Sequence, residues 1–119
     1  MSRLDRAMHE ARTRFAVDEV PVVCLLGREA EGRRHRLVVL TDHRLLVVGR
    51  GTEPLIELSA DLTRPVYDAA DRTLRLEDPT QTVVIREVEA GPAALLADLV
   101  RWRHGAPPPP RRLTLVATG

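Results

Sequence analysis

The amino-acid sequence predicts a mainly β domain: a partly open barrel or sandwich of seven short strands, with one helix before the strands and one after them. Short apolar runs recur at roughly ten-residue intervals between residues 21 and 88, a spacing typical of sandwiches and barrels. Helical periodicity replaces this pattern after residue 91. A chain of 119 residues that is 44% hydrophobic can build one core but is too short for two domains.

The first helix is expected over residues 2–14. Ser2 is placed to cap it, and Asp5, three residues later, completes a capping box. The apolar side chains recur at intervals of three and four and form one stripe: Leu4, Ala7, Met8, Ala11 and Phe15. Because this stripe is narrow and the polar side carries acids as well as bases, we expect the helix to pack on its own domain. Docking on a partner or on a membrane surface is the alternative.

A β-hairpin between residues 33 and 51 is expected to form the centre of the domain. The apolar runs 37–40 and 45–48 flank the polar step Thr41-Asp42-His43-Arg44. Two antiparallel strands joined by a tight turn have this pattern.

The remaining strands are shorter or less regular. A first strand is expected over residues 21–26, with Gly27 as a bulge or bend after it. Residues 73–77 alternate strictly, so Leu74 and Leu76 should face the core and their neighbours should face water. The other expected strands are residues 55–58, 65–67 and 81–88, the last rich in β-branched side chains.

A second helix is expected to start near Pro92 and to end before Gly105. Its apolar residues recur at helical spacing: Leu95, Leu96, Leu99 and Trp102. An open sheet needs its uncovered end closed, and a helical stripe with one large aromatic side chain suits that role. We therefore expect Trp102 to be a buried plug against the sheet, with a ligand contact as the alternative.

The C-terminal tail has a strand pattern of its own. Residues 107–110 are all proline and should form a stiff polyproline segment, after which the chain reads as a further strand containing Leu113, Leu115 and Val116. This strand is expected to pair with an exposed sheet edge, either of its own domain or of a neighbouring copy, and the second option makes the protein a homo-oligomer. A free tail and a Pro-rich ligand for an SH3-like partner are the alternatives.

These patterns divide the chain into three parts. Residues 1–16 form an N-terminal amphipathic helix, residues 17–105 form the main domain, and residues 106–119 form a Pro-rich linker with a terminal strand.

Composition excludes several classes of function. The net charge is +1, so there is no overall attraction to nucleic acid or membrane, and any anion site must be a local cluster. Phe15, Tyr67 and Trp102 are too few aromatic residues for a platform that stacks single-stranded nucleic acid, so no nucleic-acid partner is expected. Cys24, the single cysteine, lies in an apolar run and should behave as a small buried hydrophobe.

The sequence contains no targeting or membrane-spanning pattern. The charged N-terminus lacks the apolar region of a signal peptide, and no apolar stretch approaches the ~20 residues of a bilayer span. We therefore expect a soluble, cytoplasmic protein, with peripheral contact to a membrane as a further option.

No catalytic or metal-binding constellation stands out. The four histidines lack the short spacings of metal ligands, and Ser2 and Ser59, the only serines, do not lie in a nucleophile elbow. We expect no enzyme activity, no metal and no cofactor.

The order of elements, seven short strands followed by one helix with a tryptophan, resembles the pleckstrin-homology (PH) superfold, in particular the small bacterial PH-like and GRAM-like domains. The segment from Arg34 through Leu45-Leu46 resembles the second and third strands of such a domain, where a basic pair leads into a strand that ends Leu40-Thr41-Asp42. The resemblance covers roughly residues 17 to 105.

The resemblance implies a candidate ligand site in the first loop. In lipid-binding members, a basic residue, a spacer and two basic residues one apart hold inositol phosphates. The residues that match this pattern are Arg28, Arg34 and Arg36, with Arg33 and His35 beside them. Because residues i and i+2 of a strand point the same way, Arg34 and Arg36 can present two guanidinium groups to one phosphate.

Two acids in the same loop, Glu29 and Glu31, reduce its positive potential. We therefore expect first a non-catalytic binding or scaffolding module that engages a protein or peptide and self-associates through the C-terminal strand. Binding of an anionic lipid or a phosphorylated ligand through the first-loop arginines is the alternative.

Overall fold

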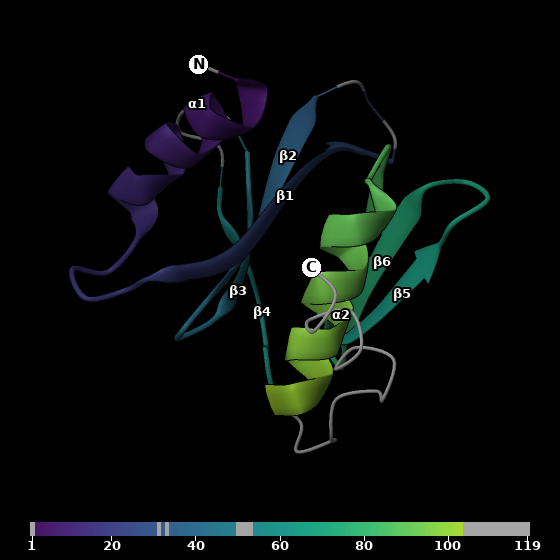
Figure 1. Ribbon diagram of the computed structural model, residues 1–119. Coiled ribbons are helices and arrows are strands. Elements are labelled where there is room, and N and C mark those ends of the chain that lie inside the picture. The colour runs from purple at the N-terminus through teal and green to yellow at the C-terminus, as the bar shows by residue number, and fades with distance from the viewer. Residues whose placement is uncertain (1, 31, 33, 50–53, 104–119) are drawn as a thin grey trace, which may run out of the picture.

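The computed structural model describes residues 2–30, 32, 34–49 and 54–103. It confirms a mainly β domain of seven strands, with one helix before them and one after them (Figure 1). The helices are α1 (Arg3–Ala11), extended by the short 3-10 helix η1 (Arg12–Arg14), and α2 (Ala90–Arg103). The strands are β1 (Pro21–Glu29), β2 (His35–Thr41), β3 (Leu45–Val48), β4 (Ile56–Leu58), β5 (Arg64–Asp68), β6 (Thr73–Asp78) and β7 (Gln81–Arg86).

All seven strands belong to one antiparallel sheet, in the order β4-β3-β2-β1-β7-β6-β5, which does not close into a barrel. β1 joins the two halves of the sheet, because most of it pairs with β2 while only Arg28 and Glu29 pair with β7. Strands β2–β4 therefore lie on one side of β1 and strands β5–β7 on the other (Figure 1). The two edges of the sheet are β4 and β5.

The two helices cover opposite faces of this sheet (Figure 1). The inner cluster packs between the sheet and α2, and its largest members include Leu25, Leu40, Leu58, Leu76 and Leu96. The outer cluster packs beneath α1 and consists of Ala11, Leu37, Val39, Leu46 and Val48, with further side chains partly buried around them. The domain thus has two apolar layers, one on each side of β1–β3.

The β2–β3 hairpin is buried on both faces, because successive residues alternate between the inner and the outer cluster. This explains why its strands are continuous apolar runs and do not alternate with polar residues. The turn is closed by Thr41, whose N–H donates to the Arg44 carbonyl at 2.8 Å. The Thr41 hydroxyl oxygen accepts from the N–H groups of His43 and Arg44, at 3.1 and 3.0 Å. The expected central hairpin is confirmed.

Helix α1 packs on its own domain, as expected, with Leu4, Ala7 and Met8 against the outer cluster. The predicted capping box is present. The Asp5 N–H donates to the Ser2 hydroxyl oxygen at 3.0 Å, and the Ser2 N–H donates to the Asp5 carboxylate at 3.3 Å. These bonds satisfy N–H groups that the first helical turn leaves without a partner.

Strand β1 is longer than expected, and the bulge expected at Gly27 lies at the other end of the strand. Its register shifts between Pro21 and Val23, whereas Gly27 pairs regularly with Arg36. Gly27 instead allows β7 to come close, since a Cβ there would overlap the Ile85 side chain and lie 2.6 Å from the Arg86 carbonyl oxygen. The crossing of β1 and β7 therefore requires glycine at this position.

The β7–α2 connection starts two residues earlier than expected. The chain leaves β7 after Arg86, passes through Glu87 at a φ of 58°, and turns Val88 into the inner cluster. The Tyr67 hydroxyl donates to the Val88 carbonyl at 2.6 Å. Edge strand β5 is thereby tied to the β7–α2 connection.

The predicted plug at Trp102 is wrong. Trp102 is 62% exposed, and Leu95 is exposed on the same side of α2. The side that packs on the sheet carries Ala93, Leu96, Ala97 and Val100. Because α2 has apolar residues around most of its circumference, two neighbouring stripes match helical spacing, and the smaller side chains face the core. Pro92 lies in the first turn as expected, whereas Gly105 lies outside the described residues.

Cys24 is half-buried in the outer layer, where it packs beneath α1. Burial raises the pKa of its thiol, and the negative charge of Asp5 adds to this effect. Both influences oppose formation of the reactive thiolate.

Candidate functional site

The first-loop arginines lie on two different faces of the sheet. In the β1–β2 register Arg28 is opposite His35, and Gly27 is opposite Arg36. Because side chains of cross-strand partners share a face and neighbours along a strand alternate, Arg28 points to the outer face and Arg36 to the inner face. The structure does not bring these two guanidinium groups together.

Arg28 and Arg36 are each engaged by a glutamate. Arg28 Nε lies 2.8 Å from a Glu87 carboxylate oxygen, and Arg36 donates to Glu29 through Nη2 at 2.7 Å and Nε at 3.2 Å. Arg34 is exposed just before β2, and Arg33 lies outside the described residues. Anion binding by this set of arginines stays a prediction.

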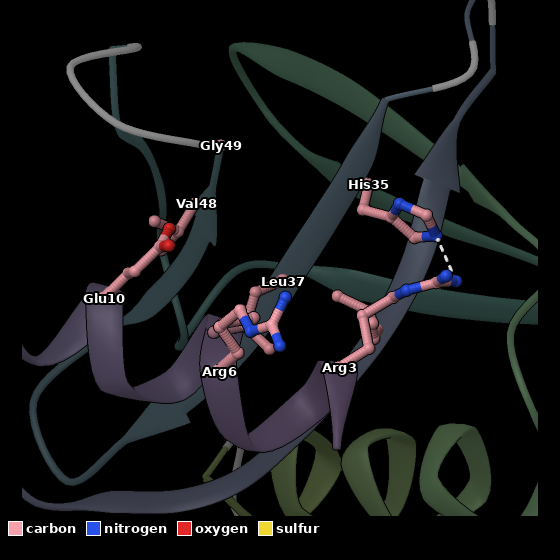
Figure 2. Close-up of a pocket in the computed structure, with 9 residues that line it drawn as sticks. Arg3, Arg6, Glu10, His35, Leu37, Val48 and Gly49 are labelled. Atoms are coloured by element: carbon pink, nitrogen blue, oxygen red, sulfur yellow. Dashed lines mark hydrogen bonds between the residues drawn. The ribbon is translucent and has the colours of Figure 1, made fainter. Parts of the chain in front are cut away.

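A pocket of about 300 Å³ lies on the outer face, between α1 and strands β1–β3. Its floor is apolar and its rim carries basic side chains: Leu26, Leu37 and Val48 below, and Arg3, Arg6 and His35 around them. Figure 2 shows Arg3, Arg6 and Glu10 extending from α1 toward β2 and β3. Of the residues that line this pocket, only His35 belongs to the first-loop basic cluster expected from the sequence.

The basic rim joins residues that are far apart in the chain. Arg3 Nη1 lies 3.0 Å from His35 Nε2 (Figure 2). A guanidinium group can only donate, so His35 Nε2 is the acceptor in this contact. In the sequence, Arg3 and Arg6 belong to the polar side of an amphipathic helix, and only their spacing of three residues marks them as neighbours on it.

A second polar cluster fastens the α1–β1 connection to the central hairpin. The Glu19 side chain has no exposed surface, and its carboxylate accepts from Arg44 Nε at 2.9 Å, Arg44 Nη2 at 3.0 Å and the Thr41 hydroxyl at 2.6 Å. The Ala16 N–H donates to it as well, at 3.0 Å. The Arg44 hydrogen bonds are the main cause that lowers the pKa of Glu19 from 4.5 to about 2.

The Arg44 guanidinium group also donates to Glu57 at 3.0 Å and to the Arg14 carbonyl at 3.1 Å. It therefore links η1, the β2–β3 turn and β4. All donors of this cluster point to groups within the domain, so we assign it a structural role. The sequence separates Glu19 from Arg44 by a strand, a loop and a second strand, and nothing in the local pattern marks them as a pair.

The sheet edge at β5 is the third candidate surface. β5 pairs with β6 on one side, and Val66 on it is 55% exposed. Leu62, in the turn before β5, is 59% exposed. The residues predicted to pair with such an edge, Leu113, Leu115 and Val116, lie outside the described residues.

Comparisons of the chain with protein-family models, with curated proteins and with solved structures found no match. The seven-stranded antiparallel sheet followed by a helix is compatible with a PH-like fold. Among the described residues, no group of three or more histidine, cysteine or acidic side chains is placed to hold a metal ion. Neither helix in the described ranges combines the length and apolar character needed to cross a membrane.

Proposed function

We propose that the protein is a PH-like, non-catalytic binding module that takes an extended peptide segment along the free edge of β5. The occupant that we propose is the C-terminal stretch, residues 113–117, of a second copy. The observation that carries this proposal is the open sheet: within the described part of the chain, β5 pairs on one side only.

The edge at β5 suits strand addition. It is five residues long, and Val66 on it and Leu62 just before it both present apolar surface to solvent. Charges and proline protect many sheet edges from pairing, and β5 has Arg64, Pro65 and Asp68, which leaves its centre at Val66 as the part open to an added strand. An added strand would gain main-chain hydrogen bonds from the residues of β5 other than Pro65, which has no N–H, and apolar contacts from Val66 and Leu62.

The C-terminal stretch matches this edge in pattern and charge. Leu113 and Leu115 alternate with Thr114, which places two leucines on one side of a strand. Arg111 and Arg112 precede them, and exposed acids lie before β5 at Asp61 and at its last position, Asp68. Opposite charges of this kind set the register of an added strand.

The proline run favours a second copy as the source of the stretch. Four prolines in polyproline geometry span about 12 Å and resist a reversal of the chain. The stretch follows α2, and α2 lies alongside β5 of the same copy. Because a stiff spacer opposes a sharp return along the same helix, we take a neighbouring copy as the source of the stretch.

Size-exclusion chromatography with light scattering, over a series of protein concentrations, tests the proposal. We expect a dimer or a larger closed assembly for the full chain and a monomer for Leu115→Asp and for Val66→Lys. Thr114→Asp is the matched control, because it adds the same charge on the other side of the strand, and it should keep the assembly. Circular dichroism verifies that each variant is folded.

A monomer at every concentration would contradict the proposal, as would an assembly that Leu115→Asp and Val66→Lys leave intact. If the full chain is monomeric and Leu115→Asp lowers its melting temperature, the stretch pairs within its own chain. The proposed pairing between two copies is then wrong.

A further inference from the structure

We infer that the pocket on the outer face binds a small amphipathic anion, a molecule with one carboxylate or phosphate group on a short apolar body. The pocket lies under α1 and is separate from the β5 edge, so this inference does not depend on the proposed function. It also uses different arginines from those of the first loop.

Arg3 and Arg6 supply the charge for this site. They lie three residues apart on one side of α1, and both line the pocket. Arg28, Arg36 and Arg44 are each paired with a glutamate. By contrast, neither Arg3 nor Arg6 is within ion-pair distance of a carboxylate in the described part of the chain, where Arg3 donates to the His35 imidazole. Arg3 and Arg6 reach the pocket from one side of α1 without an ion pair in the described part of the chain, and guanidinium groups of this kind are suited to bind an anionic group.

The apolar floor defines the rest of the ligand. Leu26, Leu37 and Val48 come from three neighbouring strands, and Leu37 and Val48 are direct partners in the β2–β3 register. Inorganic phosphate would leave this floor uncovered, whereas a short hydrocarbon chain would cover it and gain from its removal from water. The site therefore favours an anion with an apolar body over a bare anion.

Glu10 limits the ligand to one negative end. It lies on the same side of α1, seven residues after Arg3, which is about 10 Å along the helix. Its carboxylate lies at the Val48 end of the pocket, away from His35 (Figure 2). A second anionic group at that end would be repelled, while a methyl group, a hydroxyl or an amine is compatible with it.

The size of the pocket limits the length of the ligand. A volume of about 300 Å³ is at the lower end of the range for small-molecule sites, roughly 300 to 1,000 Å³. A short chain fits and a long acyl chain does not. Lipids and free metabolites share this anionic, apolar chemistry, and the experiment has to separate the two sources.

NMR titration of the full chain tests the inference with four soluble probes. Hexanoate has one negative charge and a short apolar chain. Hexanol lacks the charge, inorganic phosphate lacks the apolar body, and adipate adds a second carboxylate. We expect saturable shifts with hexanoate at the amide signals of Arg6, His35, Leu37 and Val48. Hexanol, phosphate and adipate should each bind at least about tenfold more weakly, a difference of about 1.4 kcal/mol.

Three variants assign the roles. Arg3→Gln/Arg6→Gln should weaken hexanoate binding at least about tenfold. The control Arg12→Gln/Arg75→Gln removes two exposed arginines that do not line the pocket and should leave hexanoate binding unchanged. Glu10→Gln should raise the affinity for adipate toward that for hexanoate, because it removes the repulsion at the far end. Melting temperatures verify that the variants are folded.

Shifts that map elsewhere, or hexanoate affinity equal in the Arg3→Gln/Arg6→Gln variant and its control, would overturn the inference. So would equal affinities for hexanoate and inorganic phosphate, because the apolar floor would then contribute nothing. Sedimentation with phosphatidylserine-containing vesicles, without binding of soluble hexanoate, would replace the small ligand with a membrane surface.

Discussion

The carboxylate of Glu19 should contribute more to stability than that of Glu57, the other acid on Arg44, and Glu19→Gln tests its contribution. Glutamine keeps the shape of the side chain but replaces one oxygen with an NH2 group. One carboxylate oxygen accepts from the Ala16 N–H and Arg44 Nη2, and the other accepts from Arg44 Nε and the Thr41 hydroxyl. Whichever way the amide is oriented, its NH2 group faces a donor.

The magnitude follows from the pKa of Glu19. A carboxyl group whose pKa falls from 4.5 to about 2 on folding stabilises the folded state by about 3 kcal/mol at neutral pH, since a tenfold change in proton affinity is worth about 1.4 kcal/mol. The Glu19 side chain is fully buried, but that of Arg44 is 25% exposed, and water screens part of the interaction. We therefore expect Glu19→Gln to lower the free energy of unfolding by about 2 kcal/mol.

The stability that Glu19 contributes should fall as the pH is lowered. The folded-state pKa is lowered, so the contribution of Glu19 is complete above pH 4.5 and is lost as the pH falls toward about 2. Asp42 and Asp78 also have lowered pKa values, so the wild-type protein loses stability in acid for several reasons. The difference between wild type and Glu19→Gln isolates the part due to Glu19, and it should shrink below pH 4.5.

Urea unfolding followed by circular dichroism measures this difference, and the exposed Trp102 makes fluorescence a poor probe of the core. Glu57→Gln is the matched control: it contacts the same Arg44, but its side chain is 59% exposed and its loss should cost at most about 1 kcal/mol. The reasoning is refuted if Glu19→Gln costs less than its control at neutral pH, or if its cost is the same at about pH 6 and about pH 3.

Three further predictions concern stability. Gly27→Ala should lower the free energy of unfolding by about 1 to 3 kcal/mol, because the added methyl group overlaps Ile85, and urea unfolding measures the loss. Leu96→Ala should cost about 2 to 5 kcal/mol, whereas Trp102→Ala should cost less than about 0.5 kcal/mol, since Leu96 is fully buried and Trp102 is not; similar losses would contradict the packing of α2. Ser2→Ala removes the cap of α1 and should cost about 1 kcal/mol, and an unchanged melting temperature would show that the cap contributes nothing.

Elements with local signals were predictable from the sequence. The apolar runs of β2 and β3, the strict alternation of β6 and the capping box at Ser2 each depend on neighbours within a few residues. Their strands and helix form where the local pattern places them. The number of strands and the presence of both helices follow from these signals.

Features that depend on register or on long-range contact were not predictable. The rule that residues i and i+2 share a face is correct along one strand, but it does not tell which residue of β1 lies opposite Arg36. That pairing places Arg28 on the other face. Trp102 shows the same limit for a helix, because two adjacent apolar stripes of α2 are equally regular and only the shape of the core selects one. The outer pocket needed the placement of α1 over β2, which no local pattern gives.

The layer beneath α1 also affects how freely the chain can change over evolutionary time. Most antiparallel sheets have one face in water, where substitutions cost little and sequence drift accumulates. The β2–β3 hairpin has no such face, because the outer cluster beneath α1 buries one side and the inner cluster buries the other. Neutral change must therefore concentrate in the turns, in the outward-facing positions of β5 to β7 and on the polar sides of the helices, while Leu37 to Leu40 and Leu45 to Val48 vary only among apolar residues of similar volume.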